Sequence, residues 1–160
     1  MSGVISQINT QRRAAYIHRD SLYVSEFCDW AFPGRPTLLN VRLGPTPREI
    51  RERYPALDTD RWARVWLKTC DAIVLDEGTL VLIEGELRRP IVAIGELVVY
   101  RELIPQTMSL QDYWHLPIRT VMVTPLGDPT VDPVLAQLQI ETVLYRPQWA
   151  EEYLRSVQRL

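Results

Sequence analysis

The sequence predicts an α/β fold in which a mixed central sheet is flanked by helices. From residue 63 onward, segments with the composition of strands alternate with segments that carry helix-start signals. The first two strands follow each other directly, which predicts a hairpin, and each later strand is preceded by a helix. At 160 residues and 46% hydrophobic, the chain is long and apolar enough for a single compact domain.

The first 45 residues contain few periodic segments. Residues 14–27 are compatible with either a helix or a strand, and the loop Pro33 to Pro36 follows from its proline and glycine content. Residues Thr37 to Leu43 have the composition of a short strand. We therefore expect residues 1–45 to form an extension packed on a core domain of residues 46–160.

A helix start is marked clearly at Thr46. Thr46 is a good N-cap, Pro47 suits the first helical position, and Glu49 lies three residues after the cap, as in a capping box. Pro55 disfavours helical geometry in the residue before it. The helix should therefore end near Tyr54.

The elements after residue 62 are predicted in order along the chain. Residues 63–75 and 79–87 are strand-like, and Asp76-Glu77-Gly78 between them supplies the turn. Pro90 suits the first position of a helix over residues 90–104, although β-branched residues lower its helix propensity. Beyond it we expect a buried strand at residues 119–124, a helix at 132–139, a strand at 141–145 and a closing helix at 149–157.

Charge and cysteine content argue against several classes of protein. The net charge of −2 gives no overall positive field for nucleic acid, so such a partner would need a local basic surface. Cys28 and Cys70 are far apart and form no pairing motif, as expected for reduced thiols in a cytoplasmic protein. No stretch approaches the roughly 18 apolar residues of a membrane span, and the N-terminus lacks a signal-peptide core. We expect a soluble cytoplasmic protein without a membrane partner.

The hairpin carries acidic residues where strands usually place apolar ones. Glu84, Glu86 and Arg88 alternate along the second strand, so they should project from one face. If Glu77-Gly78 forms a two-residue turn, Asp71 lies directly opposite Glu84. A three-residue turn without a bulge would instead put Asp71 and Glu84 on opposite faces.

Two carboxylates that face each other across about 5 Å can bind a divalent cation such as Mg²⁺ or Mn²⁺. The cation would lower the pKa of a bound water and stabilise the charge that builds on a phosphate. The alternative is that Asp71 begins its strand near the surface while Glu84 and Glu86 face solvent, with no functional role.

The order of these residues resembles the PD-(D/E)XK nuclease superfamily. Asp71 is followed by Glu84-Gly-Glu86 after a short hairpin, and then by a helix that carries Glu96 and Tyr100. The pattern is closest to the branch in which a D…(D/E)-x-K motif continues into a helical Q-x-x-x-Y. The likeness covers roughly residues 46–160 and implies a restriction-endonuclease-like core with the element order αβββαβ.

The resemblance implies roles for individual positions. Asp71 and Glu84 match the metal-binding acidic residues. Glu86 stands where the family usually has the lysine that positions or deprotonates the attacking water, and it would act there as base or metal ligand. Glu96 and Tyr100 match the helical Gln and Tyr.

Three residues outside this core motif have expected supporting roles. Arg88 would bind phosphate, since its pKa is too high for it to serve as a base. Glu49 or Glu52, on the helix before the sheet, would match the additional acidic residue that some members of the superfamily supply.

Two functions remain open from the sequence. The first is a Mg²⁺- or Mn²⁺-dependent nuclease that hydrolyses phosphodiester bonds of DNA, which the acidic pair favours. The alternative is a catalytically inactive nuclease-like fold that serves as a structural or assembly protein, for example in a phage virion. Glu86 in the place of lysine favours this alternative, in which the partners would be other proteins or further copies of the chain.

Overall fold

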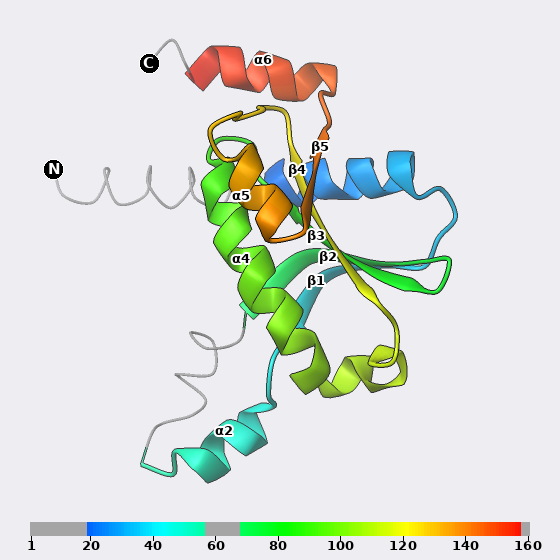
Figure 1. Ribbon diagram of the computed structural model, residues 1–160, viewed down its shortest axis with the longest axis vertical. Helices are drawn as coiled ribbons and strands as arrows, with labels where there is room; N and C mark the ends of the chain where they lie inside the picture. The colour runs from blue at the N-terminus through cyan, green and yellow to red at the C-terminus, as the bar shows by residue number, and fades with distance from the viewer. Residues whose placement is uncertain (1–18, 57–67, 158–160) are drawn as a thin grey trace, which may run out of the picture.

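The computed structural model describes residues 19–56 and 68–157, and its centre is a five-stranded sheet with helices on both faces (Figure 1). The strands are β1 (Thr37–Leu43), β2 (Lys68–Asp76), β3 (Thr79–Gly85), β4 (Ile118–Thr124) and β5 (Ile140–Leu144). They lie side by side in chain order. β1, β2 and β3 are antiparallel neighbours, whereas β3, β4 and β5 are parallel. The predicted mixed sheet is confirmed, and β2 alone runs against the other four strands.

Helices connect the parallel strands and cover the sheet. The described helices are 19–31, α2 (Pro47–Arg53), α4 (Pro90–Leu103), α5 (Asp132–Gln137) and α6 (Gln148–Val157), with 3-10 helices η1 (Ile104–Gln106) and η2 (Met108–Tyr113) after α4. α4 links β3 to β4 and α5 links β4 to β5, because parallel neighbours need a crossover connection. In the described part of the chain, no helix combines the length and apolar content that a bilayer crossing requires.

Two apolar cores lie on opposite faces of the sheet, because successive strand residues point to opposite sides. On one face, Leu80 and Leu82 of β3 pack with Leu97 of α4 and with the 3-10 helices and α5. On the other face, Val81 and Ile83 pack with helix 19–31 and α6. Because both faces of β3 are covered by an apolar core, its residues from Leu80 to Ile83 are all apolar, and Glu84 is the first charged residue of the strand.

The described part of residues 1–45 contributes directly to the sheet. β1 spans Thr37–Leu43, as predicted, and pairs with β2 from Thr37 opposite Val74 to Leu43 opposite Lys68. The ambiguous segment 14–27 is helical from residue 19, whereas residues 14–18 lie outside the described ranges. The first helix and the first strand of the fold therefore both lie before residue 46.

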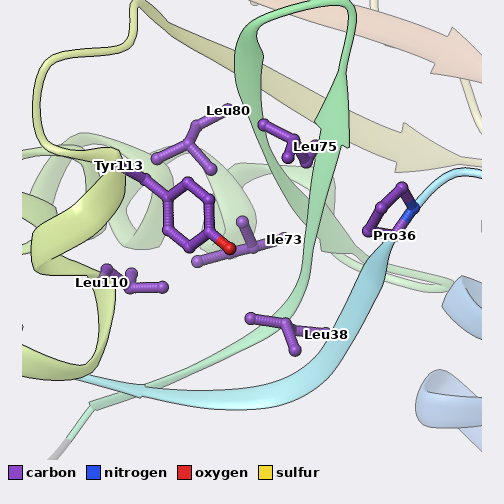
Figure 2. A pocket seen from close by; sticks show the side chains of 7 residues that line it. All are labelled: Pro36, Leu38, Ile73, Leu75, Leu80, Leu110 and Tyr113. Carbon is purple, nitrogen blue, oxygen red and sulfur yellow. The ribbon is translucent and has the colours of Figure 1, made fainter.

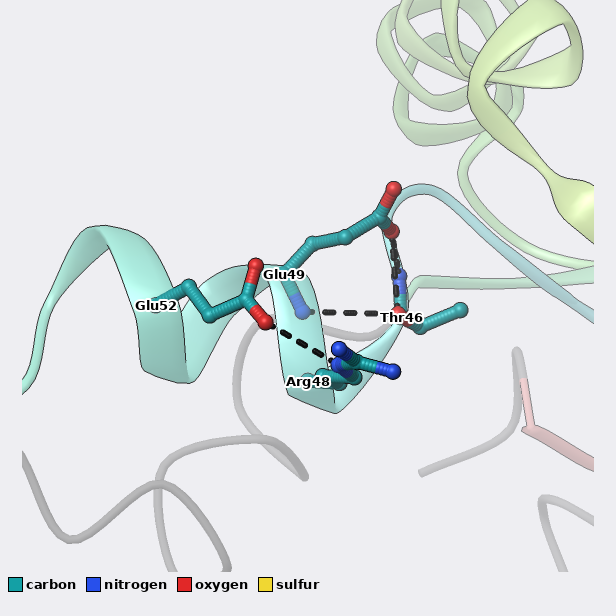
Figure 3. A network of polar contacts seen from close by, with 4 residues as sticks. All are labelled: Thr46, Arg48, Glu49 and Glu52. Atoms are coloured by element: carbon teal, nitrogen blue, oxygen red, sulfur yellow. Dashed lines mark hydrogen bonds and ion pairs between the residues drawn. The ribbon is translucent and has the colours of Figure 1, made fainter.

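Several local predictions are confirmed. The side chain of Thr46 accepts a hydrogen bond from the Glu49 N–H, and the Glu49 carboxylate accepts one from the Thr46 N–H, which completes the capping box (Figure 3). α2 ends at Arg53 with Tyr54 as its C-cap. α4 begins at Pro90 and ends within one residue of the predicted boundary. Of the strand predicted at residues 63–75, residues 63–67 lie outside the described ranges.

Candidate functional site

The turn at Glu77-Gly78 sets the register of the central hairpin. Both residues have positive φ angles, 47° and 79°, which is characteristic of a two-residue type I′ turn. Asp76 pairs with Thr79, and the register continues to Ala72 opposite Ile83. The next position of this register places Asp71 opposite Glu84. Of the two turns considered from the sequence, the two-residue turn is therefore the one that forms.

Asp71 and Glu84 meet at the open end of the hairpin, far from the turn. The Asp71 N–H donates to Glu84 Oε1 at 3.0 Å, and the Gly85 N–H donates to Asp71 Oδ2 at 2.9 Å. Glu84 is only 4% exposed and Asp71 is half-buried. The alternative in which Glu84 faces solvent is therefore wrong.

Burial makes this pair hard to ionise. Burial and then the charge of Asp71 raise the pKa of Glu84 well above its usual range. Burial also raises the pKa of Asp71, against the lowering effect of the Gly85 N–H and of Glu84. The two neighbouring carboxyl groups thus oppose each other's ionisation most strongly at Glu84, whose pKa is raised by burial and then by the charge of Asp71.

Two further groups approach the pair from α4. Burial and the charges of Asp71 and Glu86 raise the pKa of Glu96, while Lys68 lowers it. Lys68 is the single lysine of the sequence. Tyr100, one helical turn after Glu96, is buried, and its pKa is raised by burial and then by Glu96. The structure thus brings the predicted residues of α4 to the strand pair.

Asp20 on helix 19–31 is a member of this acidic cluster that the sequence did not reveal. Burial, followed by the charges of Glu86 and Asp71, raises the pKa of Asp20 to about 7. Its Oδ1 atom is buried and is the one such side-chain atom without a hydrogen-bond partner in the described ranges. The only available signal was helical periodicity around residue 20, and the sequence there was equally compatible with a strand.

Glu86 and Arg88 do not continue the face of β3 as predicted. β3 ends at Gly85, because the chain turns into the loop that leads to α4. Glu86 Oε1 accepts hydrogen bonds from the Arg88 and Arg89 N–H groups at 2.9 and 3.0 Å. Glu86 therefore orders this loop. Arg88 lies in the loop, beyond the end of β3, so the alternation of strand side chains does not determine its position.

The same loop borders an open polar pocket. It has a volume of about 350 Å³ and is lined by Glu86, Arg88, Arg89 and Val92. Glu86 also raises the pKa of Asp71 and of Asp20 through its charge, so this pocket adjoins the acidic cluster. Arg88 and Arg89 thus line the pocket together with the acidic Glu86.

Glu49 and Glu52 have structural partners on α2. The Glu49 carboxylate closes the capping box with Thr46, and Glu52 pairs with Arg48 at 3.0 Å (Figure 3). Figure 1 shows α2 apart from the two helical layers of the sheet. Glu96 is near the strand pair as expected, and the additional acidic residue that approaches from a helix is Asp20, in place of Glu49 or Glu52.

Both cysteines are free and buried. Burial and then the charges of Glu84 and Asp71 raise the pKa of the Cys70 thiol, and burial raises the pKa of Cys28 to about 12. Both side chains therefore remain neutral thiols at physiological pH. The sequence prediction of two unpaired thiols is confirmed, and neither has the low pKa of a nucleophile.

The second cavity lies at the other end of the hairpin and is apolar. It has a volume of about 80 Å³ between η2 and the strands β1 to β3 (Figure 2). Its lining is Pro36, Leu38, Ile73, Leu75, Leu80, Leu110 and Tyr113. Because Leu80 and Glu84 are four strand residues apart, this cavity is separated from the carboxylates by roughly 13 Å.

The acidic cluster has the donor chemistry of a magnesium site with few protein ligands. Across residues 19–56 and 68–157, no group of three or more His, Cys, Asp or Glu side chains is arranged to hold a metal ion. Mg²⁺ commonly binds through only one or two carboxylates, with water and substrate phosphates as the other ligands. The Asp71–Glu84 pair fits that pattern, and the orphaned Asp20 Oδ1 supplies a buried oxygen whose hydrogen-bonding capacity is unused.

Comparison of the chain with protein-family models, with curated proteins and with solved structures finds no match.

Proposed function

We propose that the chain is a metal-dependent nuclease of the PD-(D/E)XK type, which hydrolyses phosphodiester bonds of DNA. The observation that carries the proposal is the Asp71–Glu84 pair, a half-buried and a buried carboxyl group side by side on adjacent strands. Burying two acidic groups together is costly, and such groups with raised pKa values concentrate at functional sites. A divalent cation held by Asp71 and Glu84 would offset the repulsion between their charges.

The order of elements supports the same proposal. Helix 19–31, β1, β2, β3, α4 and β4 occur in the order αβββαβ, with α2 inserted between β1 and β2. Within residues 46–160, over which the resemblance was expected, the order is α2, β2, β3, α4, β4, so the third strand before α4 comes from the segment before residue 46. The acidic pair lies on the second and third strands, and the helix that follows carries Glu96 and Tyr100. Asp71, Glu84 and Glu96 therefore lie close enough on neighbouring elements for their charges to interact, which supports the proposal.

Asp71 and Glu84 would hold Mg²⁺ or Mn²⁺, which when bound supplies an activated water and stabilises charge on the phosphate. The remaining roles belong to this chain's own side chains. Arg88, beside the polar pocket, is suited to bind a phosphate of the DNA backbone. Glu96 and Tyr100 keep the pair shielded on the α4 side, and Glu86 fixes the loop that carries Arg88.

One observation favours the alternative, a nuclease-like fold with a structural or assembly role, as in a virion. Glu86, in the position of the family's lysine, has Oε1 committed to two backbone N–H groups. A carboxylate used in this way is less available as a base. In that case DNA would not be the partner, and the protein would act through contacts with other proteins or with itself.

A cleavage assay with Mg²⁺ or Mn²⁺ tests the proposal. We expect the purified protein to cut DNA only with a divalent cation, and Glu84→Gln to abolish cleavage. The amide of this variant keeps an oxygen for the Asp71 N–H, so the fold should survive, as circular dichroism would show. Glu151→Gln is the matched control, because Glu151 is an α6 residue that pairs with Arg155, and it should cut normally.

Glu86→Gln separates the two roles of that residue. The amide oxygen of this variant can still accept the bonds from the loop N–H groups, so a loss of at least about 10²-fold in rate would identify Glu86 as a base. Unchanged cleavage would assign it to loop order alone. A folded protein that neither cleaves DNA nor binds Mg²⁺ or Mn²⁺ by calorimetry would rule out the nuclease and favour the structural role.

A further inference from the structure

Asn40 has an unusual backbone conformation for a residue in the middle of a paired strand. In the described ranges, three residues other than glycine have positive φ angles: Asn40 (53°), Glu77 (47°) and Gln139 (57°). Glu77 belongs to the type I′ turn, and Gln139 directly follows the C-cap of α5, where a left-handed residue commonly ends a helix. Asn40 has neither reason, because β1 pairs with β2 on both sides of it. Its conformation therefore needs another explanation.

The residue across from Asn40 is Asp71 of the candidate site. Leu39 pairs with Ala72, so the next position of the register brings Asn40 to Asp71. Every other residue of β1 has a partner in the ladder, and the register is the same before and after this position. Neither strand therefore carries an extra residue, and the irregularity is shared by both strands.

The alternation of side chains along β2 shifts at Asp71. Ile73 packs in the core on the α4 side of the sheet and Ala72 in the core on the other face, as alternation requires. Cys70, two residues before Ala72, should share its face. It packs in the α4-side core instead.

β1 shows the same shift at Asn40. Val41 packs against the α4-side core, and Leu38, three residues earlier, lines the apolar cavity together with Ile73 and Leu80 of that core. Residues of a regular strand share a face when they are two apart, not three. A left-handed residue bends a strand and increases its twist. The positive φ of Asn40 thus accounts for the shift in β1, and the ladder on both sides carries the shift to β2.

The shift keeps the Asp71 carboxylate off the face that Glu84 occupies. Regular alternation along β2 would place Asp71 on the α4 side, which Glu84 shares with Leu82 of β3. Two carboxylates directly opposite each other on one face repel. Instead, Asp71 Oδ2 accepts the Gly85 N–H at 2.9 Å and lies 3.7 Å from the place of a Gly85 Cβ, on the side of helix 19–31.

Asp71 is therefore within reach of groups on both faces of the sheet. Burial is the largest cause of the raised pKa values of Asp20 and Glu96, and the charge of Asp71 contributes to both. Asp20 belongs to helix 19–31 and Glu96 to α4. A regular strand would give Asp71 access to one of these layers only.

We propose that Asn40 is a positioning residue of the acidic site, whose left-handed backbone holds the Asp71 carboxylate at the open end of the hairpin between the two helical layers. Its role in catalysis rests on the proposed function, whereas its effect on Asp71 does not. Because Asn40 acts through its backbone, glycine should replace it and a β-branched residue should not.

Amide hydrogen exchange of the full chain, followed by NMR, tests the proposal. The Asp71 and Gly85 N–H groups donate to the two carboxylates of the pair, so their exchange reports on its geometry without any metal. Asn40→Val should speed their exchange at least about tenfold relative to the Leu82 N–H in the centre of the sheet. Asn40→Gly should keep the relative rates of the wild type. Asn40→Ala, which the left-handed region excludes less strongly than valine, should show the same change if Asn40→Val does not fold.

Gln139→Val is the matched control, because it places a β-branched residue at another exposed left-handed position. It should lower the stability of the protein and leave the relative exchange of Asp71 and Gly85 unchanged. An equal rise at Asp71, Gly85 and Leu82 in Asn40→Val would overturn the proposal. An Asn40→Gly variant that exchanges like Asn40→Val would also overturn it.

A cleavage assay with Mn²⁺ separates failure of this inference from failure of the proposed function. Asn40→Val should cut DNA at least about tenfold more slowly than the wild type, and Asn40→Gly should restore cleavage. A wild type that does not cut would refute the nuclease, and the exchange rates would still decide the role of Asn40. A wild type that cuts, with a folded Asn40→Val that cuts equally fast, would overturn the positioning role alone.

Discussion

The two ends of the β2–β3 hairpin handle charge in opposite ways. At the turn, Arg35 bridges Asp76 at 2.9 Å and Glu77 at 2.8 Å, and the Glu77 side chain is 78% exposed. At the open end, Glu84 is buried and Asp71 is half-buried, and each carboxylate accepts a hydrogen bond from a backbone N–H group. The same pair of strands thus has a solvated acidic end and a buried one.

The two ends differ in what their charges contribute to stability. Exposed ion pairs are screened by water and contribute little to stability in either direction. Buried carboxyl groups without a nearby cation resist ionisation and lower stability at neutral pH. Keeping such a group at one end of the hairpin costs stability, and the nuclease proposal gives a reason for that cost.

The largest effect should come from the apolar core near the turn end. Leu80 is 2% exposed and packs in the α4-side core. Leu80→Ala should lower the free energy of unfolding by about 2–5 kcal/mol, through lost burial and the cavity left behind. Urea denaturation followed by tryptophan fluorescence would measure it. A loss below about 1 kcal/mol would show that the adjoining pocket collapses to fill the space.

The next effect concerns the open end and depends on pH. The pKa of Glu84 is raised above its ordinary value of 4.5, so the folded state binds a proton that the unfolded state releases. That stabilisation is complete below pH 4.5 and is lost as the pH rises toward the folded pKa. Glu84→Gln removes this titration, so at pH 8 it should raise the free energy of unfolding by about 1–3 kcal/mol.

Thermal denaturation of the wild type and of Glu84→Gln between about pH 4 and pH 9 would measure this dependence. We expect the wild type to lose stability with rising pH and the variant to lose less. Addition of Mg²⁺ at pH 8 should recover stability in the wild type alone. Parallel curves for the two proteins would contradict the raised pKa of Glu84.

The smallest effect should occur in the exposed pairs of the turn. Arg35→Ala removes both ion pairs with Asp76 and Glu77, and should lower the free energy of unfolding by only about 0.2–1 kcal/mol. The loss should shrink further in high salt, because these charges are solvated. A loss as large as that of Leu80→Ala would contradict this prediction, because it would show that the exposed ion pairs of the turn contribute strongly to the free energy of unfolding.

Local signals in the sequence predicted much of this hairpin and its neighbours. The type I′ turn at Glu77-Gly78 alone places Asp71 opposite Glu84, because side-chain alternation carries the register along both strands. The cap at Thr46 and the strand Thr37–Leu43 were equally readable. Each of these features depends on residues within a few positions of one another.

Features that depend on distant segments could not be predicted. The Glu86 N–H donates to the Val123 carbonyl of β4 while its side chain orders the loop, and this ends β3 before the predicted position. Asp20 reaches the acidic cluster only because helix 19–31 packs over β3. At Gly85 that approach is so close that a Cβ would overlap the Val24 side chain. No local pattern indicates such a contact.

Two hydrogen bonds between the first and last parts of the described chain affect the order in which the fold can form during translation. The Tyr23 hydroxyl donates to the Tyr145 carbonyl at 2.6 Å, and the Trp149 indole N–H donates to Glu26 at 2.6 Å. During translation, helix 19–31 is made early, and it can form these two hydrogen bonds only after residues 145–149 have left the ribosome. The hairpin that carries Asp71 and Glu84 therefore leaves the ribosome before the helical layer over that face is complete.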